Sequence, residues 1–217
     1  MPESAIGLFP DVGASLFLGR CPKPVARLMG MTGHIVGAVD CLLLGLATAQ
    51  VPSDSLAGLK KKLLQCQVED VYSIIKQFQC DVGQSSLAIQ RRLIDHIFAD
   101  GPVELMRDRA AILAENMPHN KQLGSIVTAF ETRCPLSIKL FDRLLFETDH
   151  LTDPLAAIEL DFHLALRMTK RADFAEGVRA IVIDKDHSPR WTPNSLEAVT
   201  ETMLDAVFDR SGLPSLL

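Results

Sequence analysis

Two carboxylates whose spacing suits chemistry lie within the first 20 residues. Glu3 comes just before an apolar turn, and Asp11 lies inside a Pro-Asp-Val-Gly turn. Backbone rich in Gly and Pro holds such groups in place, and a positioned carboxylate can activate water or attack a carbonyl carbon. Because most surface carboxylates are only solvated, a solvated acidic pair is the alternative interpretation.

The residues around these carboxylates form a longer pattern. Met1–Gly13 contains Met-Pro-Glu-x-x-Ile-Gly-x-x-Pro-Asp-x-Gly. This resembles the acidic segment of the crotonase (enoyl-CoA hydratase/isomerase) superfamily, and within it the 3-hydroxyisobutyryl-CoA hydrolases. The resemblance implies that Glu3 is the catalytic acid, base or nucleophile, and that Asp11 lies near it at the acyl end of the substrate. It also implies that Gly7 and Pro10 bind substrate, that the substrate is a coenzyme A thioester, and that neither a cofactor nor a metal is needed.

A second stretch of resemblance covers Ala172–Pro193, ADFAEGVRAIVIDKDHSPRWTP, and is similar to the ending of the hydrolase branch. Asp173 and Glu176 have the spacing of a capping box. Residues 178–183 form an apolar run that β-propensity would allow as a strand, but the preceding cap favours a short helix. Lys185 follows in a charged turn, and it is expected either to contact the ligand or to have an architectural role.

The resemblance also predicts what these residues cannot do alone. In the family, the oxyanion hole and most of the coenzyme A surface come from a segment before the acidic motif. The Gly-Gly-Gly turn of that segment is not among these 217 residues. The implied activity is hydrolysis of 3-hydroxyisobutyryl-CoA in valine breakdown, with this chain inactive by itself. Hydration or isomerisation of an enoyl-CoA is one alternative, and a non-catalytic helical assembly module is another.

The hydrophobic pattern predicts a mainly α fold. By resemblance this is the C-terminal portion of a crotonase-type α/β spiral plus a helical region, with one or two short strands. Residues 1–54 would end the core and carry the acidic motif, and residues 55–217 would form the helical region. Residues 47–51 are expected to be a strand or an extended segment. Helices are expected at 24–31, 36–44, 55–65, 68–79, 87–99, 102–116, 120–133, 135–146, 155–171 and 195–210.

Composition narrows the class of protein. The net charge of −5 argues against nucleic-acid binding, and no apolar run approaches the roughly 18 residues of a membrane span. Five scattered cysteines without metal spacing predict free thiols in a reducing compartment. A mean hydropathy of +0.17 suggests interface surface and a possible homo-oligomer. The chain shows no targeting signal, and the resemblance predicts the mitochondrial matrix in a eukaryote and the cytoplasm otherwise.

Three other groups of residues could bind ligands, but each has a simpler interpretation. Glu159 and His163 have helical spacing, yet zinc normally takes three or four ligands, which favours a surface pair. His96 is expected to be a packed or surface histidine. The lysines at 60–62 are expected to be a solvated helix face rather than a coenzyme A phosphate site.

Overall fold

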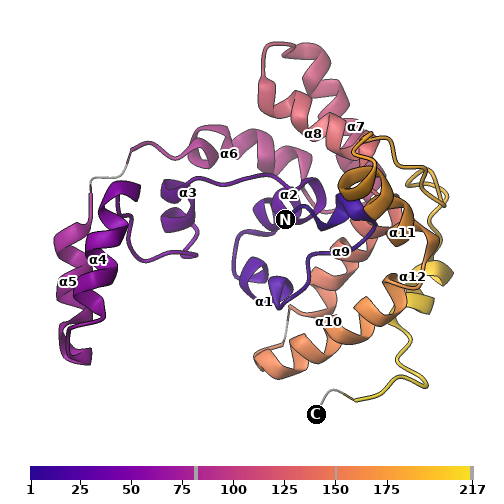
Figure 1. Cartoon of the computed structure of the whole chain (residues 1–217). Helices are drawn as coiled ribbons and strands as arrows, with labels where there is room; N and C mark the ends of the chain where they lie inside the picture. The colour runs from indigo at the N-terminus through magenta and orange to yellow at the C-terminus, as the bar shows by residue number, and fades with distance from the viewer. Residues whose placement is uncertain (81–82, 150, 216–217) are drawn as a thin grey trace. The chain divides into compact units, whose positions relative to one another are not determined.

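The computed structural model describes residues 1–80, 83–149 and 151–215, and the regular structure in them is helical (Figure 1). The described residues divide into two compact units, Met1–Ile35 with Arg92–Leu217, and Val36–Arg91. The mainly helical prediction is confirmed. The division into residues 1–54 and 55–217 concerns family regions rather than compact units, and it stays a prediction.

The larger unit consists of helices packed around α2 and α9, which are mostly buried. α2 packs against α8 and α9, and α7 packs against α8 (Figure 1). Gly30 of α2 lies directly against the ring of Phe141 in α9, where a Cβ atom would collide with it. The bounds in this unit are η1 Glu3–Ile6, α1 Ala14–Gly19, α2 Lys23–Thr32, α7 Val103–Asn116, α8 Lys121–Thr132, α9 Pro135–Glu147, α10 Pro154–Met168, α11 Ala172–Val178, the π-helical η4 Arg179–Ile183 and α12 Glu201–Phe208.

The two stretches that carry the family resemblance pack against each other. η1 contacts both α11 and η4. A Cβ atom on Gly7 would lie 2.6 Å from the carbonyl oxygen of Asp173, and one on Gly177 would collide with the backbone of Ile6. Only a residue without a side chain permits such an approach. The spacing of glycines in both motifs therefore follows from one backbone contact.

The smaller unit consists of α3 Ala38–Leu43, η2 Ser53–Ser55, α4 Leu56–Leu63, η3 Val68–Asp70 and α5 Val71–Phe78, and α6 Ser86–Ile97 begins in it. α4 packs against α5. Asp40 is buried and accepts hydrogen bonds from the hydroxyls of Ser85 and Ser86 at 2.6 and 2.8 Å. Burial opposes ionisation of Asp40, but its hydrogen bonds lower its pKa overall. This carboxylate therefore ties α3 to the start of α6.

Several local predictions were wrong. The described residues contain none of the one or two expected strands, so of the two alternatives for 47–51 the strand is excluded. Asp173 and Glu176 do not form a capping box, because Asp173 lies inside α11 and accepts from the backbone N–H of Thr192 at 2.7 Å. The last helix begins at Glu201 rather than residue 195, because Thr200 caps it through its hydroxyl.

Other predictions are confirmed. Residues 178–183 continue α11 as a π-helix rather than forming a strand. The helices expected at 135–146 and 155–171 are α9, which Pro135 opens, and α10, which Asp153 caps by accepting from the backbone N–H of Leu155 at 2.9 Å. All five cysteines are free thiols.

Candidate active site

Glu3 lies on η1, a single 3-10 turn that three neighbours hold in place. The next residue, Ser4, is fully buried, and its hydroxyl donates to the carbonyl of Met31 at 3.1 Å. The Ser4 carbonyl accepts from the backbone N–H of Cys134 at 2.9 Å. Gly7 ends the turn in the left-handed conformation, with its N–H directed to the Glu3 carbonyl. The backbone of Glu3 is therefore fixed by α2, α9 and α11 together.

The side chain of Glu3 carries a buried oxygen that has no partner. Its Oε2 atom is inaccessible to solvent and makes no hydrogen bond. Native proteins rarely leave such an atom unsatisfied, and each case calls for an explanation, such as a catalytic role. The guanidinium of Arg133 is a charged neighbour: burial lowers its pKa, and the charge of Glu3 acts in the opposite direction. Glu3 and Arg133 thus form a partly desolvated pair of opposite charges.

Arg133 also lines a groove between the end of α2 and α8. The groove has a volume of about 640 Å³. Both polar and apolar side chains line it: Thr32, Gly33, His34, Ile35, Lys121, Gly124, Ser125, Ile126, Thr128, Ala129, Thr132 and Arg133. Gly33 lets Met1 and Arg133 pack closely against the groove, because a Cβ atom there would lie 2.9 Å from the carbonyl of Met1 and 3.3 Å from the Arg133 guanidinium. The groove therefore runs beside the segment that carries Glu3.

Asp11 is half-buried in a turn of unusual geometry. Val12 and Gly13 both have positive φ, at 59° and 75°. The N–H of Gly13 donates to Oδ2 of Asp161 at 2.6 Å, and Asp161 is almost fully buried on α10. Burial raises the pKa of Asp161 to about 6; the Gly13 hydrogen bond lowers it, and the charge of Asp11 raises it further. A third carboxylate, which sequence reasoning missed, therefore lies under the turn of Asp11.

Comparison with known proteins identifies the family of this site. The family model described as "Enoyl-CoA hydratase/isomerase" matches residues 1–208. The chain belongs to the enoyl-CoA hydratase/isomerase family. It is 33% identical over 219 residues to "Probable 3-hydroxyisobutyryl-CoA hydrolase 2" of Arabidopsis thaliana, covering 97% of this chain and 57% of the relative. It is 34% identical over 223 residues to "3-hydroxyisobutyryl-CoA hydrolase, mitochondrial" of Gallus gallus, covering 98% and 56%. The chain thus spans a little over half the length of these relatives.

Solved structures of the family share the fold. An enoyl-CoA hydratase from Rhodobacter sphaeroides 2.4.1 is 27% identical, with a TM-score of 0.84, covering all of this chain and 60% of the other. A carnitinyl-CoA dehydratase from Mycobacterium thermoresistibile has a TM-score of 0.87 at 24% identity, also over the whole chain and 60% of the other. The crotonase-type fold is therefore shared by proteins named for different reactions.

The structure places the other residues predicted from the family as follows. Gly7 is buried, and the backbone of Asp173 occupies the space that a side chain on Gly7 would need. Pro10 is buried as well. Lys185 is exposed on a turn with a φ of 57°. Among the described residues, no hydrogen bond links Glu3 to Asp11. A contact of Gly7, Pro10 or Lys185 with substrate stays a prediction.

The prediction for His163 was wrong in one respect. His163 is buried rather than on the surface, and its Nε2 lies 2.9 Å from the carbonyl of Pro214. Glu159 accepts from the hydroxyl of Ser215 at 2.7 Å. Both side chains thus hold the C-terminal segment on α10. His96 is exposed, and the part of the chain that the structure describes contains no cluster suited to a metal ion. Nor does any described helix have the length and apolarity to cross a membrane.

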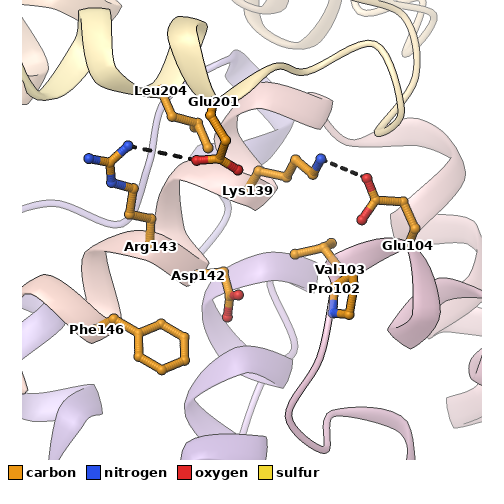
Figure 2. A pocket seen from close by; sticks show the side chains of 9 residues that line it. All are labelled: Pro102, Val103, Glu104, Lys139, Asp142, Arg143, Phe146, Glu201 and Leu204. Carbon is orange, nitrogen blue, oxygen red and sulfur yellow. Dashed lines mark ion pairs between the residues drawn. The ribbon is translucent and has the colours of Figure 1, made fainter.

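A second cavity lies among α7, α9 and α12, with a volume of about 360 Å³ (Figure 2). Figure 2 shows Lys139 directed toward Glu104 and Arg143 toward Glu201, at 2.6 and 4.0 Å. Asp142 accepts from Nε of Arg27 at 2.8 Å. Each of these charged side chains is already paired, which distinguishes this cavity from the surroundings of Glu3.

Proposed function

We propose that this chain supplies the acidic part of an acyl-CoA thioester hydrolase that acts on 3-hydroxyisobutyryl-CoA in valine breakdown. The proposal rests mainly on the buried, unpartnered Oε2 of Glu3 in a backbone turn held by three helices. Membership of the family and the names of the similar hydrolases support it. The thioester is the substrate, and the reaction needs no cofactor.

Glu3 would act at the thioester carbonyl by one of two routes. As a general base, its carboxylate takes a proton from water while the water oxygen bonds to the carbonyl carbon. As a nucleophile, it bonds to that carbon itself, and water then hydrolyses the resulting anhydride. In both routes the carbon–sulfur bond breaks, and coenzyme A leaves as a thiolate that takes up a proton. A single turnover in ¹⁸O-water separates the routes, because only the anhydride can transfer unlabelled oxygen from Glu3 to the product.

Asp11 would orient the attacking water or bind the hydroxyl of the substrate. Gly7 and Pro10 would shape the acyl end of the pocket, and Lys185 would contact the ligand from its exposed turn. The oxyanion needs backbone N–H donors, and losing one such donor costs roughly 3 kcal/mol of barrier. The family supplies a donor from a Gly-Gly-Gly turn that is not among these 217 residues. We therefore expect the 217 residues alone to be inactive.

A chimera tests this proposal. The part of the Gallus gallus relative that precedes its matched region would be fused before Met1 and assayed for thiol release from 3-hydroxyisobutyryl-CoA. We expect turnover by the chimera, a loss of about a hundredfold to ten-thousandfold in Glu3→Gln, and no loss in Glu69→Gln, an exposed control. A folded chimera that releases thiol equally well with Glu3→Gln would overturn the role of Glu3.

Hydration or isomerisation of an enoyl-CoA is the second candidate, favoured by the likeness to the Rhodobacter sphaeroides hydratase. The same chimera would distinguish the two reactions, because hydration consumes the enoyl double bond without releasing thiol. Faster Glu3-dependent loss of the enoyl chromophore than thiol release would favour the hydratase.

A homo-oligomer, or a purely structural assembly role, is suggested by apolar side chains in the unit Val36–Arg91. Leu64, Val68 and Tyr72 are exposed there. A melting temperature that rises with protein concentration but not with coenzyme A would favour assembly.

A location in the mitochondrial matrix, if the source is eukaryotic, is proposed from the mitochondrial relatives and would be checked by organelle fractionation.

A further inference from the structure

The turn that carries Asp11 is strained and its own side chains do not explain it. Val12 is β-branched, and a φ of 59° is a genuine outlier for such a residue. Its side chain is 78% exposed, so packing does not offset the strain. A conformation of this kind persists only where the surrounding structure enforces it, and such positions gather at active sites.

Asp161 is the group that enforces this turn. Its Oδ2 atom accepts the N–H of Gly13, and this 2.6 Å hydrogen bond joins residues 148 positions apart. Ile158, one turn earlier on α10, lies 3.6 Å from the position of a Cβ atom on Gly13. The turn is therefore fastened to α10 by one charged hydrogen bond and one apolar contact.

The other oxygen of Asp161 is unused. Asp161 is only 4% exposed, and its Oδ1 atom is buried without a hydrogen-bond partner. If its only task were to hold Gly13, a neutral amide would serve without the penalty of burying a charge. A buried acid under a turn that carries a second carboxylate is an arrangement in which each negative charge opposes ionisation of the other group.

No other charged group packed near α10 contributes to the raised pKa of Asp161. α1, which packs on α10, has no titratable side chain from Ala14 to Gly19. α12 also packs on α10, but its Asp205 and Glu201 face Arg143, at 2.6 and 4.0 Å. On α10 itself, Glu159 and His163 bond to the C-terminal segment. Asp11 is thus the charge that acts on Asp161.

We propose that Asp161 is a positioning residue for Asp11, which fixes the strained turn and whose ionisation is coupled to the charge of Asp11. Its assignment to catalysis rests on the proposed function, whereas the coupling of the two acids does not. In this pair, one proton moves between water and Asp161 as the pH changes, and the Gly13 hydrogen bond weakens when Asp161 becomes neutral. The pH dependence of any reaction that uses this turn then includes the ionisation of Asp161.

The test is an NMR titration of the Gly13 amide in the 217-residue chain, which needs neither substrate nor turnover. We expect its proton resonance to titrate with a midpoint near pH 6, because burial and Asp11 together raise the pKa of Asp161 to about 6. Asp161→Asn keeps an oxygen that can accept from Gly13 and should abolish this titration. Asp11→Asn should keep it but move the midpoint to lower pH.

Two controls keep the result interpretable. Asp153→Asn changes an acid on the same helix to an equally good capping residue and should leave the Gly13 titration unchanged. If Asp161→Asn fails to fold, Val12→Gly in the same chain relieves the strained φ, so the double variant restores a measurable state. A Gly13 amide that does not titrate between pH 4 and 8, or that titrates identically in Asp11→Asn, would overturn the proposal. If the coupling is found but thiol release in the chimera does not depend on Asp11, the proposed function fails and the coupling stands.

Discussion

The larger unit contains two groups of buried charged side chains, one with hydrogen-bond partners and one that leaves carboxylate oxygens without them. Asp142, which lines the cavity of Figure 2, accepts from the buried guanidinium of Arg27 at 2.8 Å, and this guanidinium also donates to Asp100 and to the carbonyl of Phe98, both at 2.9 Å. Near the acidic motif, Glu3 and Asp161 each keep one buried oxygen without a partner. Satisfied buried charges hold a structure together, whereas unsatisfied ones are retained where something else must bind.

The difference assigns separate roles to two regions of one fold. The charged groups around the cavity of Figure 2 are structural, because their charges neutralise one another. The acidic segment leaves carboxylate oxygens without partners, but its backbone is fixed by close approaches at Gly7 and Gly177. Rigid backbone combined with incompletely paired carboxylates is the pattern expected of a preorganised site.

The largest expected effect is the loss of stability when the buried Arg27 is removed. Arg27→Met removes all three hydrogen bonds and leaves Asp142, whose pKa burial already raises, without its cation. Breaking a buried ion pair costs roughly 3–5 kcal/mol of unfolding free energy, which urea denaturation would measure. Part of the loss should be recovered at low pH, where Asp142 is protonated. The exposed Arg20→Met is the matched control, and an equal small loss in both would refute the structural role of Arg27.

The free energy of unfolding is expected to change by about 3 kcal/mol with pH because of Asp161, the buried acid under the Asp11 turn. The folded pKa of Asp161 is raised from 3.8 to about 6, and each unit corresponds to about 1.4 kcal/mol. Because the folded state binds this proton more tightly, stability from this group is present below about pH 4 and is lost as pH rises to about 6. Denaturation at several pH values should show this fall in the wild type and not in Asp161→Asn. Glu176, whose pKa its bond to Arg179 lowers to about 2, acts in the opposite direction and only at more acidic pH.

The backbone contact between the two motifs gives a smaller effect on stability. Gly177→Ala would drive a Cβ atom into the backbone of Ile6, which must shift with η1. Overpacking of this kind costs roughly 1–3 kcal/mol, measurable as a lower urea midpoint. Gly19→Ala, at a helical position with open space, should not destabilise the chain. If Gly177→Ala were as stable as Gly19→Ala, the rigidity assigned to the Glu3 segment would be wrong.

The smallest effect is expected at Val12. Val12→Gly removes the strain of a positive φ, but adds chain entropy to the unfolded state, so the net gain should be about 0.5–1 kcal/mol. A rise of a few degrees in melting temperature would show it. A loss of stability would mean that the exposed valine is not strained, and the turn would then need no clamp from Asp161.

The sequence allowed much of this to be predicted, but only where the signal was local. Helices and the Pro135 and Asp153 starts follow from periodicity and capping. Asp161 was missed because Leu155, Ile158, Phe162 and Leu166 have helical spacing and predict a different buried face for α10. The buried positions are instead Ala157, Leu160, Asp161, His163, Leu164 and Met168, and Leu155 is half-exposed. A one-position rotation of a helix face places a carboxylate either in solvent or under the Asp11 turn.

The capping box of α11 failed for a related reason. Asp173 and Glu176 have the correct spacing, but their carboxylates bind the backbone N–H groups of Thr192 and Arg190, at 2.7 and 2.9 Å. These partners are 19 and 14 residues away, so no local pattern reveals them. Tertiary contacts thus reassigned two side chains that the sequence predicted to act within one helical turn.

The most direct test of the contrast is a carboxyl ¹³C NMR titration of the 217-residue chain with 3-hydroxyisobutyryl pantetheine, a thioester without the nucleotide of coenzyme A. We expect the side-chain carboxyl resonances of Glu3 and Asp11 to move, and those of Glu104 and Glu201 at the paired cavity to stay constant. Movement at Glu104 and Glu201 with none at Glu3 would contradict the assignment of the acidic segment as the thioester site.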